Sequence, residues 1–252
     1  MIRFFFSLVL FALNFSSTAS ARVFNFADLN VSSYLRGAGG TAYFGNDAFG
    51  NAGGSGATYS EGVLYQFSGE FGFSFELSSM TARLGFEMHR PQHLTNYEAK
   101  NSGGTTLYYV DSDIISYSPT LTFEIPLSKS QTTKSYTFLG AGYAYVTMKN
   151  QITFTSAGTS AYSLADFIED TKGQTIFGIA GWGFETLMVD NVTFGMEFGY
   201  RYMEVYRMVH KAASTNFLGS SAEGSAVKNT GGTDRFLNLS QPFMSFVFRF
   251  YI

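Results

Sequence analysis

Nine charged residues stand on the polar side of segments in which polar and apolar residues alternate. Five are acids and four are bases, so their charges almost cancel. An unpaired buried ion costs several kcal/mol, so charges that are enclosed together must pair. The sequence predicts an internal ion-pair network, which is either structural or a gate whose pairs exchange. Its candidate members are Arg36, Glu70, Arg83, Glu87, Glu124, Glu185, Glu197, Arg201 and Arg249.

Histidines and aspartates are the other side chains that could support catalysis or bind a metal. His89, His93 and His210 could each act as a general base beside an acid, but their spacing matches no dyad or triad. The sequence also contains no Gly-x-Ser-x-Gly motif. Asp111 and Asp113 supply two carboxylates, whereas Ca²⁺ takes about six to eight oxygen ligands. We therefore expect no enzymatic activity, no metal and no cofactor.

The segment 243–252 shows which element could hold such charges. Its residues alternate with period two, so a strand would carry an aromatic face opposite a face that contains Arg249. In water the aromatic face would promote aggregation. In a membrane-spanning β-barrel the same face is the surface that lipid requires. The apolar set is Met244, Phe246, Phe248, Phe250 and Ile252.

Seven further segments predict strands, and several of them carry charges on their polar faces. Their apolar faces are too aromatic and too numerous for the core of one soluble sandwich. We therefore place the apolar faces outward in lipid and the polar faces inward in a lumen. Alternation is clear at 63–76, 82–89, 115–125 and 192–202, and glycine and alanine weaken it at 34–44, 136–148 and 175–187.

The connections alternate strictly between short and long. Short turns are expected at 78–79, 128–134 and 190–191. Long extracellular loops are expected at about 45–58, 90–112, 155–173 and 210–234. This pattern predicts an all-β fold, a transmembrane antiparallel up-and-down barrel of eight strands. Ten strands remain the alternative if 22–32 forms a strand or a long loop contains a hairpin.

Composition and the first residues indicate export. Residues 1–21 have the features of a signal peptide, with Arg3, an apolar stretch from Phe4 to Leu13 and a cleavage site at Ala19-Ser20-Ala21. Residues 22–252 would form the barrel domain. This part has no run of about 18 uncharged apolar residues that would predict a membrane helix. The net charge of −3 argues against binding nucleic acid.

The strand-and-loop pattern and the terminal aromatic series resemble the small eight-stranded outer-membrane barrels, the family of outer-membrane protein A transmembrane domains and outer-membrane protein W. The resemblance implies location in the outer membrane of a Gram-negative bacterium, among outer-membrane lipid and lipopolysaccharide. It also implies a monomer, whose last strand the barrel-assembly machinery reads. The candidate assembly signal is Phe246, Phe248, Phe250 and Ile252, with Ile252 where the family usually has phenylalanine.

Three functions follow from these expectations. The first is a structural or surface-interaction role, in which the barrel anchors loops that meet an unknown ligand. The alternative is a porin-like channel or conduit for ions or small hydrophobic solutes. A remote alternative is an envelope enzyme with its active site at the outer rim.

Overall fold

The computed structural model describes residues 26, 31–44, 49, 57–59, 62–229 and 231–252. The predicted signal peptide, 1–21, and most of the predicted loop 45–58 lie outside these residues. None of the helices in the described part of the chain is long and apolar enough to cross a membrane.

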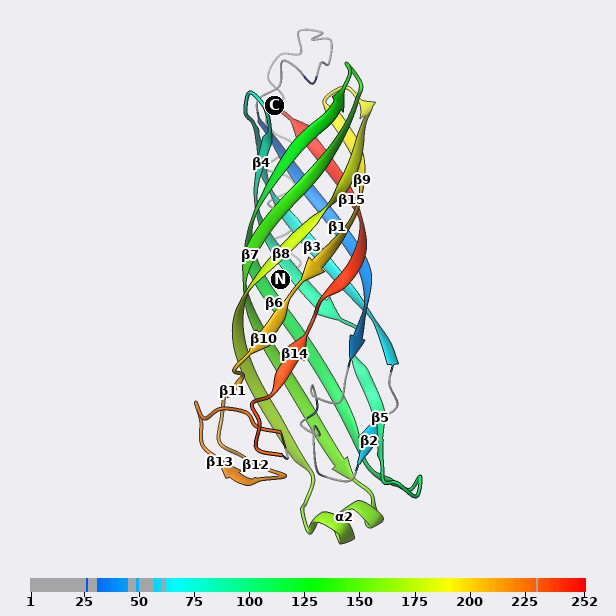
Figure 1. The fold of residues 1–252 in the computed structure, drawn as a ribbon, viewed down its shortest axis with the longest axis vertical. Helices are drawn as coiled ribbons and strands as arrows, with labels where there is room; N and C mark the ends of the chain where they lie inside the picture. The colour runs from blue at the N-terminus through cyan, green and yellow to red at the C-terminus, as the bar shows by residue number, and fades with distance from the viewer. Residues whose placement is uncertain (1–25, 27–30, 45–48, 50–56, 60–61, 230) are drawn as a thin grey trace, which may run out of the picture.

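Eight antiparallel strands form a closed ring (Figure 1). The ring closes where β1 pairs with β15, from Ser32 opposite Tyr251 to Gly40 opposite Phe243. Closure leaves no strand edge within the ring, which lipid requires because every backbone polar group must be paired there. The prediction of eight strands is confirmed. They are β1 (Val31–Phe44), β3 (Gly62–Glu76), β4 (Thr81–Pro91), β6 (Thr106–Lys129), β7 (Thr133–Phe154), β8 (Phe167–Val189), β9 (Val192–Tyr202) and β15 (Gln241–Tyr251).

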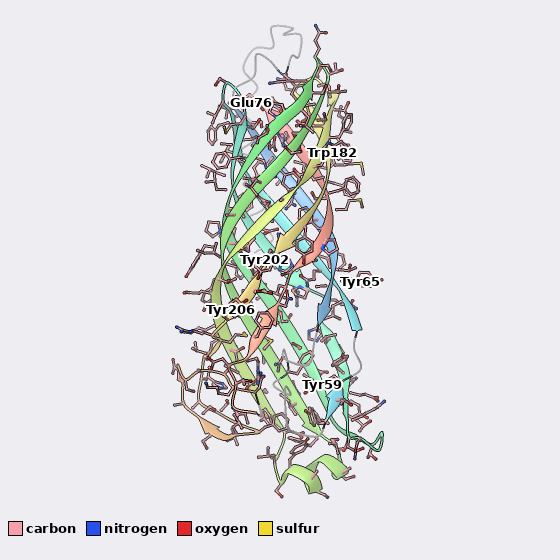
Figure 2. The ribbon with its side chains drawn as sticks, viewed as in Figure 1. Tyr59, Tyr65, Glu76, Trp182, Tyr202 and Tyr206 are labelled. Carbon is pink, nitrogen blue, oxygen red and sulfur yellow. The ribbon has the colours of Figure 1, made fainter. Side chains whose placement is uncertain are left out.

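Aromatic side chains cover the outside of the ring. Phe71, Phe198 and Phe246 are 50%, 46% and 42% exposed, whereas the nine predicted lumen charges are all buried. This is the transmembrane arrangement, with apolar residues outward and polar residues inward. Trp182 lies toward one end of this belt, and Tyr65 and Tyr202 lie farther along the barrel (Figure 2). Such amphipathic rings suit the two interfaces of a bilayer.

The three short turns all lie at one end of the barrel. They join β3 to β4, β6 to β7 and β8 to β9, at the positions that the sequence predicts. In the last of them Asp190 adopts a left-handed φ of 44°, beside Asn191, which lets the chain reverse within two residues. Residue 252 lies at this same end (Figure 1).

The opposite end contains more regular structure than the predicted loops allow. Segment 90–112 consists largely of the end of β4, of β5 (Leu94–Lys100), which pairs with β6, and of the first residues of β6 itself. β2 (Thr58–Tyr59) extends this sheet by pairing with β5. Segment 155–173 contains the helix α2 (Ser156–Tyr162) and the start of β8. The loop assignment of these two segments was therefore wrong over much of their length.

Segment 210–234 and its flanks also carry short strands. β11 (Val209–His210) pairs with β8, and β12 (Ser214–Asn216) pairs with β13 (Gly219–Ser221). β10 (Glu204–Tyr206) pairs with β14 (Phe236–Asn238). Pairing with neighbouring segments accounts for strand structure here, which a composition rich in serine, glycine and threonine does not predict.

β6, β7 and β8 extend well beyond the membrane. They contain 24, 22 and 23 residues, whereas a strand crosses a bilayer with about 9–11. At about 3.3 Å per residue they reach roughly 70–80 Å. α2 sits on their far end, where a Cβ on Gly158 would lie 1.9 Å from the Leu107 carbonyl oxygen. Glycine at this position therefore allows the helix to approach β6 closely.

Candidate functional site

The lumen of the membrane-spanning half contains one connected set of charges. Glu197, on β9, lies near its centre and accepts hydrogen bonds from Arg36 Nε at 2.9 Å and Arg83 Nη1 at 2.5 Å. Ser245 Oγ and Tyr136 OH also donate to this carboxylate, each at 3.0 Å. Four strands besides β9 thus hold one carboxylate in place.

Glu124, on β6, is the second centre of this network. Arg249 binds it through both terminal nitrogens, with Nη1 at 3.1 Å, and Arg83 Nη1 lies 3.1 Å from its other oxygen. Lys134 Nζ approaches at 3.2 Å and also reaches Glu76 at 3.0 Å. Arg83 therefore links the Glu124 centre to Glu197.

The remaining predicted charges attach to these two centres. Arg36 Nη1 lies 3.1 Å from Glu70 and 3.7 Å from Glu87, and Glu87 also pairs with Arg201. Arg249 Nη1 lies 3.3 Å from Glu185. The structure thus brings all nine predicted residues into one network, hereafter the charge network, together with Lys134. With Lys134 it holds five buried bases and five buried acids.

Lys134 was missed because the sequence analysis assigned it to a polar link between strands. The signal that could have found it is the alternation Lys134, Tyr136, Phe138, which continues the inward face of β7 to the start of that strand. All three side chains are buried. Extending the alternation by one residue pair would have placed the lysine in the lumen.

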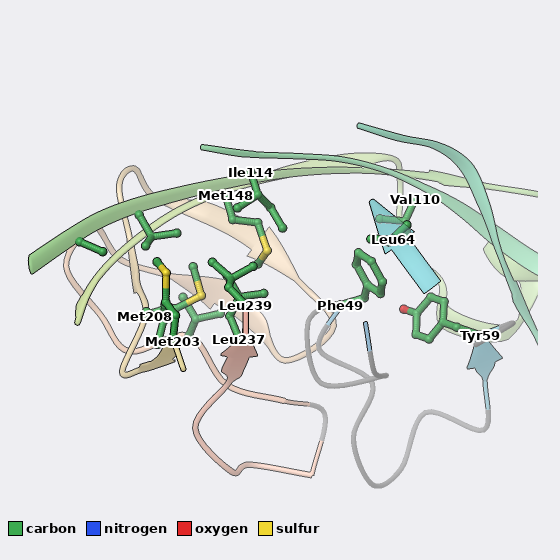
Figure 3. Close-up of a cluster of buried hydrophobic side chains, with 14 of the residues drawn as sticks. Phe49, Tyr59, Leu64, Val110, Ile114, Met148, Met203, Met208, Leu237 and Leu239 are labelled. Atoms are coloured by element: carbon green, nitrogen blue, oxygen red, sulfur yellow. The ribbon is translucent and has the colours of Figure 1, made fainter. Parts of the chain in front are cut away.

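A second seal, also missed, crosses the interior above the charge network. It is built from aliphatic side chains and methionines that are each 4% exposed or less, and we call it the apolar layer (Figure 3). Its members are Ile114, Val146, Met148, Met203, Val205, Met208, Leu237 and Leu239. On the opposite side Leu64, Phe49 and Tyr59 continue the same buried cluster. The inward alternation of β6 and β7 could have predicted part of it, since Ile114 follows Ser116 and Ser118 on one face.

Aromatic rings form the outermost interior of the barrel. Tyr108, wholly buried, packs against Phe154, Tyr162 and Phe217 with ring centroids 5.2–5.9 Å apart. Tyr108 and Tyr59 also share a hydrogen bond of 2.8 Å between their hydroxyl groups. Because Tyr162 lies on α2 and Phe217 follows β12, these rings tie the outer segments to the long strands.

The end with the short turns is also covered. Phe26 is 1% exposed, and its ring meets Tyr251 edge-on at 5.8 Å. Leu187 packs against the same pair. Tyr251 in turn donates a hydrogen bond of 3.0 Å to Glu185, so these apolar groups border the charge network.

The three histidines lie in three different surroundings. His89 is inside the lumen rather than at the outer rim, 3.3 Å from Gln241 Nε2. His93 is half exposed, 3.9 Å from Asp113. His210 Nδ1 lies 3.4 Å from Ser214 Oγ, but its Nε2 has no hydrogen-bond partner among the described residues. Burial lowers the pKa of His210, although nearby Glu169 opposes this effect.

Both aspartates of the considered calcium site have other partners. Asp111 accepts a hydrogen bond of 2.6 Å from the Asn96 amide, and Asp113 pairs with Arg90 at 2.9 Å. No group of three or more potential metal ligands occurs within the described part of the chain. These residues bind one another at the outer end of the barrel.

The candidate assembly residues face outward on β15. Phe246, Phe248 and Phe250 are about equally exposed, and Ile252 is 79% exposed. Phe194 on β9 contacts Phe246 and Phe248, with centroids 5.8 and 5.2 Å apart. The aromatic series is thus part of the lipid-facing belt.

Fold and site together define a class: an eight-stranded transmembrane β-barrel with a sealed lumen and a structured extra-membrane end. No family model matches the chain, and the comparison with curated proteins gives no match. The fold assignment rests on this chain's own strand pairing and outward aromatic belt.

Solved structures with some similarity are outer-membrane proteins. The outer membrane protein OprG from Pseudomonas aeruginosa has a TM-score of 0.45 at 13% identity, covering 89% of this chain and 97% of that one. A major outer membrane protein from Thermus thermophilus has a TM-score of 0.45 at 12% identity, covering 86% and 99%. The attachment invasion locus protein Ail of Yersinia pestis has a TM-score of 0.40 at 13% identity, covering 89% and 99%.

Proposed function

We propose that this chain is an integral protein of the bacterial outer membrane, with a structural or surface-interaction role. The barrel anchors an ordered extracellular structure made from the ends of β6, β7 and β8 and the segments that pack on them. One observation carries this proposal. The lumen is crossed by two successive seals, the charge network and the apolar layer.

The charge network opposes ion flow because each of its charges already has a partner. Opening a path would separate pairs that are buried on all sides, and breaking one such pair costs about 3–5 kcal/mol. The apolar layer adds a second barrier, since an ion crossing it would lose its water without gaining a polar partner. A steady conduit would require both barriers to move.

The extracellular end supports the surface role. Its core of buried aromatic and aliphatic residues is continuous with the long strands, so the surface it presents is held rigidly. Its exposed residues include most of α2 and the β12–β13 hairpin. Outer-membrane lipid and lipopolysaccharide would surround the belt below. We expect a monomer, exported by residues 1–21 and assembled through Phe246, Phe248, Phe250 and Ile252, with a ligand at the extracellular surface.

Conductance of the refolded protein in planar bilayers tests the proposal. Folding is confirmed first by a heat-modifiable gel shift. We expect no current steps from the wild-type protein. Steady ohmic steps would refute the sealed lumen and favour the alternative, a channel for ions or small solutes.

A matched pair of variants shows whether the assay can detect an opening. Replacing Met148 and Met203 together by glycine removes two side chains of the apolar layer, whereas replacing Met188 and Met244 removes two exposed ones. We expect more frequent current fluctuations only from the first pair. Equal behaviour of the two pairs would show that the apolar layer does not limit current.

A further inference from the structure

Between the charge network and the apolar layer lies a level of the lumen whose polar atoms are not satisfied by the protein. Gln66, on the inward face of β3, is fully buried, and neither its Oε1 nor its Nε2 has a hydrogen-bond partner among the described residues. Glu70, two inward positions along the same strand, binds Tyr34, Arg36 and Thr120. The contrast marks a change in the lumen within one strand.

Three other buried side chains at this level share the property. Gln241 Oε1, His89 Nδ1 and two nitrogens of Arg201, Nε and Nη1, have no partner in the described protein. The strand register brings these residues together, because Gln241 lies opposite Arg201 and its Nε2 lies 3.3 Å from His89 Nε2. Gln66 lies opposite Gly40, and Ser68, the next inward residue of β3, lies opposite His89.

Gly40 gives the Gln241 side chain its place in the lumen. A Cβ on Gly40 would lie 2.5 Å from Gln241 Oε1 and 2.4 Å from the Pro242 carbonyl oxygen. The backbone oxygen could not yield, so only glycine fits where β1 meets β15 at this level. The wall is therefore shaped to admit the glutamine amide.

Leaving these atoms unsatisfied would be very costly. An unmade hydrogen bond of a buried polar group costs about 1–3 kcal/mol. Six such atoms on four side chains would approach the whole net stability of a protein, about 5–15 kcal/mol. A hydrogen-bonding molecule must therefore satisfy most of them.

The chemistry of the four side chains defines that molecule. Arg201 and the Gln66 amide offer donors, while Gln66 Oε1 and Gln241 Oε1 offer acceptors. The charge of Arg201 is matched by Glu87. A neutral molecule that donates and accepts fits such a site, and water is the one that buried polar cavities generally hold. We propose that Gln66, His89, Arg201 and Gln241 surround a closed chamber that binds ordered water.

Magnetic resonance of the full chain, folded in detergent micelles, tests this directly. The measurement is cross-relaxation between water and the Gln66 side-chain amide, whose signal is identified by its loss in Gln66→Met. We expect a cross-peak from water that stays bound for longer than about a nanosecond, as buried waters do. A Gln66 amide with no water contact would overturn the proposal.

The stability of the same variant gives a second, signed readout. If water satisfies Gln66, Gln66→Met leaves the remaining waters short of a partner, and the urea midpoint falls. If Gln66 is dry, Gln66→Met removes an unsatisfied amide, and a higher midpoint would overturn the chamber. Gln151→Met is the matched control, because Gln151 is exposed on β7. If Gln66→Met does not fold, the Gln241 amide in the wild-type protein provides the same cross-relaxation test.

The chamber and the sealed lumen can fail separately. Current steps in planar bilayers would refute the proposed function and leave long-lived water at Gln66 intact. A silent barrel with a dry Gln66 would refute the chamber alone.

Discussion

The membrane-spanning half and the extra-membrane half of the barrel are built by the same strands with opposite polarity. Along β6, Phe123 and Leu121 face out while Glu124 and Thr122 face in. Farther along the strand Asp113 and Asp111 face out, and Ile114, Val110 and Tyr108 face in. The backbone pairing with β7 continues through this inversion. Strand geometry is therefore common to both halves, and the surrounding medium decides which face is apolar.

The difference has an energetic counterpart. In lipid the interior can be polar, because burial of apolar surface between protein parts gains little there and the outer face is already in an apolar medium. In water the interior must be apolar, because its burial is the main force that orders the segments. The charge network and the apolar layer are the two results, stacked in one tube.

The largest expected effect comes from breaking the charge network at its centre. Glu197→Gln removes the charge that both Arg36 and Arg83 contact, which leaves buried guanidinium groups short of a partner. We expect a loss of about 3–5 kcal/mol in the free energy of unfolding, measured by urea titration of the gel shift. Glu98→Gln breaks only an exposed pair with Lys100 in the extra-membrane half and should cost about 0–1 kcal/mol. Similar losses for the two variants would contradict the comparison.

The second effect tests the interior of the extra-membrane half. Met148→Ala leaves a cavity in the apolar layer, and we expect a loss of about 2–5 kcal/mol in unfolding free energy. Met188→Ala, at a position 65% exposed, is the control and should change stability by less than about 0.5 kcal/mol. A negligible effect of Met148→Ala would mean that this interior is loosely packed.

The third effect compares outward faces. Phe198→Arg places a charge in the lipid-facing belt and should cost about 2–4 kcal/mol if it lies near the middle of the bilayer. Ile168→Arg changes an outward residue of β8, 48% exposed, in the extra-membrane half. We expect this variant to assemble as the wild type does, judged by the fraction folded on the gel. Failure of Ile168→Arg alone would place the membrane at the wrong end.

The smallest effect is a dependence on pH confined to the extra-membrane half. His210, which faces Glu169 and Arg235, has a pKa below its ordinary 6.5 because it is buried. The unfolded segment therefore binds more protons near and below that pH, so local stability falls as the pH drops through this range. Amide exchange of β11 should be faster at pH 5 than at pH 7, and His210→Gln should reduce the difference. Unchanged pH dependence in that variant would assign the effect to another group.

The faces of the strands could be predicted because alternation is a local property. Period-two patterning identified the outward aromatic belt and the nine inward charges without knowledge of any contact. The partners within the charge network could not be predicted. Whether Arg83 meets Glu197 or Glu70 depends on how the strands stagger around the ring, which no single strand encodes.

The extra-membrane half was predicted poorly for a physical reason. The analysis assumed one polarity for the whole interior, so the inverted alternation of residues 106–114 was assigned to a loop. The same assumption hid the apolar layer, because methionine and isoleucine on an inward face had no role in a polar lumen. An inversion in phase along a continuing alternation is the signal that could have revealed both.

The polarity inversion along β6, β7 and β8 also fixes the depth at which the protein floats. Sliding the barrel one residue pair into the bilayer would drag the charged side chains of Asp113, Lys149 and Lys172 beneath the waterline. Sliding it outward would lift Tyr117, Tyr143 and Tyr145 into water. Both displacements are uphill, so the inversion works as a Plimsoll mark: the sequence itself records how high the extracellular platform stands above the lipid.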